Sequence, residues 1–111
     1  MRRLALARVF ALLAACGGAS EPTPTATVAF TIDAPFCGSR IPAVFSIDGV
    51  RVGADTFVVH LAGEHLTTRP FTTAPGRHTL GATAGYYTWP DTQVTLDPGQ
   101  ALTHTLSFYC S

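Results

Sequence analysis

The sequence predicts an all-β protein, a small sandwich of about seven antiparallel strands. From Val28 onward, apolar and polar residues alternate with a period of two, as they do in half-buried strands. Turn-forming pairs such as Asp48-Gly49, Pro75-Gly76 and Pro98-Gly99 interrupt this alternation at short intervals. No stretch has the 3.6-residue spacing of a helix, and a chain of 111 residues allows one small domain.

Each expected strand carries its own alternating set. Asp48-Gly49 favours a two-residue turn, so the residues on either side of it should form a hairpin. Thr67 to Thr73 should be an edge strand, because Pro70 cannot donate a hydrogen bond to a ladder. The other alternating sets are, in chain order, Val28, Phe30 and Ile32; Phe45 and Ile47; Val50 and Val52; Phe57, Val59 and Leu61; His78, Leu80 and Ala82; and Thr92, Val94 and Leu96.

The last strand has the clearest pattern. One of its faces carries Leu102, His104, Leu106, Phe108 and Cys110, and the other carries Thr103, Thr105 and Ser107. Short strands at this spacing, joined by turns and without helices, predict an immunoglobulin-like or prealbumin-like sandwich over residues 28–111.

The first fifteen residues have the pattern of a secretory signal peptide. Arg2, Arg3 and Arg8 give a positive start, and the run from Val9 to Ala15 is apolar and far shorter than a membrane-spanning helix. The sequence Leu13-Ala14-Ala15-Cys16 resembles the lipobox of bacterial lipoproteins. This resemblance implies cleavage before Cys16, acyl chains such as palmitate on that cysteine, and attachment to membrane lipid. The alternative is an ordinary signal peptide with a chance cysteine.

Residues 16–27 form the expected tether. Glycine, proline and threonine dominate this stretch, and such a composition cannot build a core. The predicted location is therefore the outer face of a bacterial membrane. Because Gly17 and Gly18 follow the cysteine, the resemblance favours the outer membrane in a cell that has two.

A second resemblance concerns the domain itself. Several turns of this sequence resemble those of PEGA-type and carboxypeptidase-regulatory-like sandwich domains. They are Ser46-Ile47-Asp48-Gly49, the run from Pro75 to Leu80, Gly85-Tyr86 and Gly99. The name-giving motif is absent, since Cys37 to Pro42 stands before Phe45. The resemblance implies a spacer or binding module without catalysis.

With Cys16 assigned to lipid, Cys37 and Cys110 remain as a pair in an exported protein. We expect them to form a disulfide, which is the usual state of an even number of cysteines in that compartment. Two free thiols or half of a metal site are the other possibilities.

Charge and residue spacing argue against several functions. Four arginines and seven acidic residues follow Cys16, so this part carries a charge of −3 and no basic stripe for nucleic acid. The four histidines, His60, His65, His78 and His104, lack the spacing of a zinc motif, so surface or capping roles are expected. No catalytic residue, metal or cofactor is predicted, and the acidic residues are interpreted as turn residues.

The run from Gly85 to Pro90 holds Tyr86, Tyr87 and Trp89. These rings are a possible ligand platform, on which sugars or a partner protein would stack. The alternative is that Tyr86 and Trp89 fill the core. The sequence therefore predicts a membrane-anchored lipoprotein of the cell envelope, with a non-catalytic structural or protein-interaction domain, or alternatively a glycan-binding module.

Overall fold

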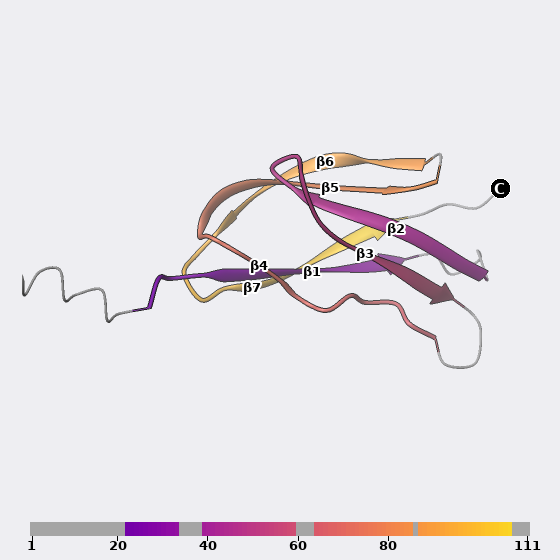
Figure 1. Cartoon of the computed structure of the whole chain (residues 1–111), viewed down its shortest axis with the longest axis horizontal. Helices are drawn as coiled ribbons and strands as arrows, with labels where there is room; N and C mark the ends of the chain where they lie inside the picture. Colours follow the sequence, from indigo (N-terminus) through magenta and orange to yellow (C-terminus); the bar gives the residue numbers. More distant parts are fainter. Residues whose placement is uncertain (1–21, 34–38, 60–63, 86, 108–111) are drawn as a thin grey trace, which may run out of the picture.

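The computed structural model describes residues 22–33, 39–59, 64–85 and 87–107. These residues form seven strands, which Figure 1 colours along the chain. The strands are β1 (Ala26–Asp33), β2 (Ser39–Ile47), β3 (Val50–Val59), β4 (Phe71–Thr73), β5 (Gly76–Ala84), β6 (Tyr87–Leu96) and β7 (Ala101–Ser107).

The strands form two sheets, which confirms the predicted all-β sandwich. One sheet has three strands in the order β4-β1-β7, and the other has four in the order β3-β2-β5-β6. In Figure 1, β5 and β6 lie above β1 and β7, and the core fills the space between the sheets. The first strand begins at Ala26, two residues before the predicted start of the domain.

One pairing corrects the expected antiparallel arrangement. β1 and β7 run parallel, with register partners from Thr27–Ala101 to Asp33–Ser107, whereas the other pairings are antiparallel. Alternation in a sequence shows which face a side chain occupies but not the direction of the strand. A parallel pair requires a long connection, and here the whole intervening chain provides it.

The turn between β2 and β3 is the predicted hairpin. Asp48 has φ of 54° and Gly49 has φ of 79°, so both central residues lie in the left-handed region. This is the conformation of a type I′ turn, which suits the twist of the strands and which Asp-Gly adopts at low cost.

Four phenylalanine rings join the two sheets. Phe30 of β1 stacks on Phe45 of β2 with ring centroids 4.5 Å apart. Phe57 of β3 meets Phe45 edge-on at 5.9 Å, and Phe71 of β4 contacts both Phe30 and Phe45. Such pairs each add about 0.5–1.5 kcal/mol to the effect of area burial.

Most of the remaining core follows the predicted alternation, but several buried residues, among them Ile41 and Ala43, belong to no predicted set. Phe71 belongs to no predicted set but is buried, and a Cβ on Gly53 would lie 2.5 Å from its ring, so glycine is needed there. Val50, which forms an alternating set with Val52 in the sequence, begins the edge strand β3 at the hairpin tip and is 66% exposed. The remaining buried hydrophobic residues are Ala26, Val28, Ile32, Ile41, Ala43, Ile47, Val59, Leu80, Ala82, Trp89, Leu96 and Leu106.

Residues 64–70, which we call the crossover segment, connect the two sheets along one side. His65 exchanges backbone hydrogen bonds with Val58 of β3 (2.8 and 2.9 Å). Leu66 and Thr68 then bond to β1, through Leu66 O to Ile32 N (3.0 Å) and Thr68 N to Phe30 O (2.9 Å). The expected strand from Thr67 to Thr73 is therefore shorter, because only Phe71–Thr73 after Pro70 forms a regular ladder.

Candidate functional site

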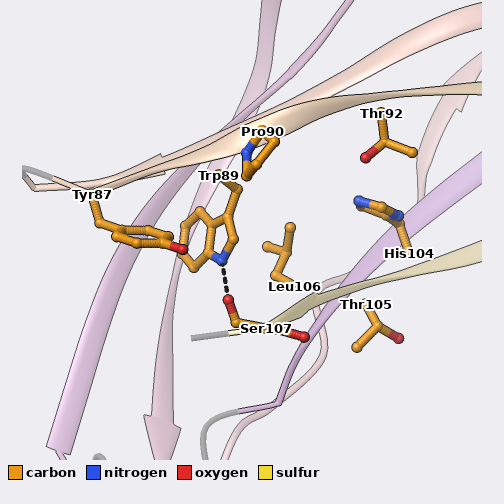
Figure 2. Close-up of a pocket in the computed structure, with 8 residues that line it drawn as sticks. All are labelled: Tyr87, Trp89, Pro90, Thr92, His104, Thr105, Leu106 and Ser107. Atoms are coloured by element: carbon orange, nitrogen blue, oxygen red, sulfur yellow. Dashed lines mark hydrogen bonds between the residues drawn. The ribbon is translucent and has the colours of Figure 1, made fainter. Parts of the chain in front are cut away.

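On the side of the sandwich opposite the crossover segment, no backbone segment among the described residues bridges the two sheets, and we call this the open side. There the edge strand β6 of one sheet lies across from the edge strand β7 of the other. A hydrogen bond joins these two strands: the indole Nε1 of Trp89 donates to the carbonyl oxygen of Ser107 at 2.7 Å. Figure 2 shows this bond at the end of β7.

A groove of about 240 Å³ lies between the two edges. β6 provides an aromatic side and β7 a side of alternating polar and apolar residues, as Figure 2 shows. The lining residues are Tyr87, Trp89, Pro90, Thr92, His104, Thr105, Leu106 and Ser107. None of them is an Asp, Glu, Lys or Arg, so this groove suits neutral groups such as an apolar side chain, a peptide backbone or a sugar face.

The structure brings together two of the three aromatic residues that the sequence singled out. Trp89 is 4% exposed and belongs to the core, whereas Tyr87 is 38% exposed at the mouth of the groove. Their rings meet edge to face, 5.0 Å apart and at 79°, so they do not form one flat surface. Tyr86, the third residue of the proposed platform, lies outside the described residues.

His104 is a half-buried polar residue that lines the groove. Its side chain projects from β7 toward the core and meets the Phe30 ring edge-on at 5.9 Å. Burial lowers the pKa of His104, because the charged imidazolium loses water there. The ring is therefore neutral at neutral pH and has one nitrogen that donates and one that accepts. The sequence placed His104 on the inward face but gave no sign that a groove would lie beside it.

The other described histidines lie in separate places. His65 Nε2 is 2.7 Å from Asp55 Oδ2 on the β3 side, and His78 Nδ1 is 2.6 Å from Asp48 Oδ2 at the hairpin turn. Among residues 22–107, apart from the undescribed gaps, no three His, Cys, Asp or Glu side chains gather as metal ligands. His60 falls in one of those gaps.

His78 connects two turns. Its second ring nitrogen, Nε2, is 2.6 Å from the carbonyl oxygen of Ala74, and Asp48 also accepts the backbone N–H of Thr79 at 2.8 Å. A carboxylate and a carbonyl only accept hydrogen bonds, so both ring nitrogens donate only when the imidazole carries two protons. The bond to Asp48, followed by the bond to Ala74, therefore raises the pKa of His78. The sequence had suggested only a surface or capping role for this histidine.

The three cysteines, Cys16, Cys37 and Cys110, lie outside the described residues, as does the predicted leader. Across the described part of the chain, no helix has the length and apolar character that a membrane span requires. No protein-family model matches this sequence, and no curated protein matches it.

The His78–Asp48 contact predicts how the free energy of unfolding changes with pH. The pKa of His78 is raised in the folded protein, so this histidine stabilises the fold fully below about pH 6.5, the pKa of a free histidine. The stabilisation is lost as pH rises through the pKa of His78 in the folded protein. Bonds from Thr79 and then His78 lower the pKa of Asp48, so its contribution is present above about pH 3.8 and is lost as pH falls through the folded value.

Urea unfolding of the wild type and of His78→Gln between about pH 5 and 9 measures this effect. As pH rises, we expect the free energy of unfolding to fall more in the wild type than in the variant. The difference in this free energy between the two proteins should therefore become smaller. His104 contributes with the opposite sign, but it is present in both proteins and cancels in the difference. Parallel pH profiles would contradict the assignment.

Proposed function

We propose that this protein is a non-catalytic lipoprotein of the bacterial cell envelope, whose sandwich binds a partner through the groove between β6 and β7. The observation that carries the proposal is the asymmetry of the sandwich. The crossover segment bonds to both sheets on one side, whereas the other side leaves an uncharged groove with aromatic residues between two strand edges. Open strand edges and aromatic rings are common features of protein-binding surfaces.

The direction of the strands supports an anchor at the other end of the domain. The proposed lipid-bearing Cys16 precedes the start of β1 at Ala26 by ten residues, which span at most roughly 35 Å. Since β1 and β7 are parallel, Ala101 lies at the tether end of the sandwich and Ser107 at the far end. Within a single copy, the Trp89–Ser107 end of the groove is therefore remote from the point where β1 begins.

The same register supports the proposed disulfide. Asp33 and Ser107 are partners at the ends of β1 and β7, and Cys37 and Cys110 follow them by four and three residues. The two segments that carry the cysteines thus leave neighbouring strands at one end of one sheet. A bridge that closes so long a loop would stabilise the fold by roughly 4 kcal/mol.

Two of the acidic residues support the non-catalytic interpretation. Asp48 accepts the backbone N–H of Thr79, and Asp55 accepts that of Thr56 at 2.8 Å. Asp48 lies in the predicted turn, whereas Asp55 lies within β3 and corrects the expectation of a turn residue. Both side chains accept backbone N–H groups, which is a structural role.

A glycan is the second candidate ligand. The exposed ring of Tyr87, together with the hydroxyl of Thr92 and the imidazole of His104, gives the groove a stacking surface and neutral hydrogen-bonding groups. Sugars are recognised by such combinations of aromatic faces and polar groups.

Intact-mass measurement on the chain purified without reductant from a bacterial host tests the anchor and the bridge together. We expect loss of residues 1–15, added mass of acyl chains on Cys16, and no reaction of Cys37 or Cys110 with an alkylating reagent. Cys16→Ser should abolish the acyl mass and leave the other two cysteines unreactive. Equal acylation of wild type and variant would overturn the anchor, and alkylation of both remaining cysteines would overturn the bridge.

Photo-crosslinking on intact cells tests the binding site. A benzoylphenylalanine at Tyr87, at the mouth of the groove, should form a discrete adduct with a protein or a polysaccharide. The matched position is Thr83, which is exposed but lies on the central strand β5, and it should give no such adduct. Absence of any adduct at Tyr87 in a folded chain would reject the groove as a binding site.

A further inference from the structure

In the described part of the chain, the strand β7 has one hydrogen-bonding edge that no other strand pairs with. In the parallel ladder, Thr27 N bonds to Gln100 O at 2.9 Å, which sets the alternation along the pair. The even-numbered residues of β7 therefore bond to β1, and the N–H and C=O groups of Ala101, Thr103 and Thr105 point away from it. Among the described residues, no backbone group pairs with these three.

The other three sheet edges each carry a feature that hinders pairing. β4 has three residues and lies between Pro70 and Pro75. β6 contains Pro90 and Asp91, opposite a register shift between Leu80 and Ala82 of β5. Short strands, prolines, inward bends and charges are the usual means by which natural sheets avoid edge-to-edge association.

The edge of β3 is also hindered. The pairing of β3 with β2 contains a register shift between Phe45 and Ser46 of β2. At the other end of β3, the bridge between Val58 and His65 covers the edge. The strand also carries charged residues, Arg51 and Asp55.

In contrast, β7 has none of these features. Its seven residues are Ala101, Leu102, Thr103, His104, Thr105, Leu106 and Ser107, and its register with β1 is unbroken. It contains no proline and no acidic or basic residue, and burial keeps His104 neutral. An uncharged, unbent edge strand is a ready template for another strand.

We propose that β7 pairs antiparallel with β7 of a second copy of this chain, which joins the two three-stranded sheets into one. The inference rests on the proposed function, because it names the partner of the same open side. A two-fold axis at Thr103 places it opposite its own copy and Ala101 opposite Thr105. Since the strand is uncharged, no like charges oppose each other in this self-complementary interface.

The paired strand also extends over the groove. Residues opposite each other in an antiparallel pair share a face, so Leu102 of one copy lies beside His104 of the other on the core side of the sheet. Both side chains are half-buried in the single chain and would become more buried in the pair. Neutral His104 is compatible with that environment, whereas a charged residue would not be.

The antiparallel arrangement has a consequence for the anchors. The tether enters each sandwich at the Ala101 end of β7, so the two tethers leave from opposite ends of the joined sheet. The strands of the pair would then lie along the membrane surface, which tethers of roughly 35 Å permit.

Crosslinking of the full chain in intact cells tests this pairing. Benzoylphenylalanine at Thr105 should give an adduct of twice the chain mass, in which the captured peptide includes the region of Ala101. Thr103→Pro should abolish it, because proline removes an outward N–H that makes no bond to β1. Thr103→Val keeps that N–H and should retain the adduct. Benzoylphenylalanine at Thr83, on the central strand β5, should give none.

A second set of variants keeps the test independent of any damage by proline. Thr103→Asp and Thr103→Lys should each abolish the adduct, because the two-fold axis places like charges opposite each other, while Thr103→Asn should retain it. Co-expression of the aspartate and lysine variants should restore an adduct between the two.

The outcomes separate this inference from the proposed function. No doubled mass at Thr105, an adduct of another mass, or a doubled mass insensitive to the Thr103 variants would overturn the β7 pairing. If Tyr87 still captured a different molecule in that case, the groove would remain the binding site. If neither position captured anything, both proposals would fail.

Discussion

The two halves of this sandwich are held together along one side by the backbone hydrogen bonds of the crossover segment. His65 bonds to β3 in one sheet, and Leu66 and Thr68 bond to β1 in the other. The hydroxyl of Thr68, which is buried, also accepts the N–H of Phe30 and donates to the carbonyl of Arg69. These bonds satisfy backbone groups that would otherwise lie buried without partners, and the strand edges that the segment covers cannot pair with other strands. In the described part of the chain, the opposite side has no such segment, and this difference places the groove and the free edge of β7 there.

Aromatic rings in the core also hold the two sheets together. Phe30 and Phe45 come from different sheets and stack at the centre, and Phe71 enters from β4 directly after the crossover segment. The segment is thus fixed at both ends, by ladder bonds at His65 and by a buried ring at Phe71. On the open side, Trp89 both fills the core and donates a hydrogen bond to β7, so a single side chain spans the gap between the sheets.

Much of the fold was predictable because period-two alternation reports burial directly. Val28, Phe30 and Ile32 are buried as expected, and the Asp48-Gly49 turn has the backbone that the dipeptide favours. The parallel direction of β7 was not predictable, since alternation is the same in both directions. The groove was also not predictable, because it depends on which edges face each other. The hydrogen bond between Asp48 and His78 joins residues thirty positions apart, which the pairing of β2 with β5 brings together.

The central claim is that β7 presents an unpaired edge on the open side of the sandwich. Residue-resolved amide hydrogen exchange measures this directly. In dilute solution, the amides of Leu102, His104 and Leu106, which bond to β1, should exchange slowly, whereas those of Thr103 and Thr105 should exchange fast. Protection of Thr103 and Thr105 should then rise with protein concentration. Equal, concentration-independent protection of all five amides would show that the chain itself covers this edge, and it would contradict the account.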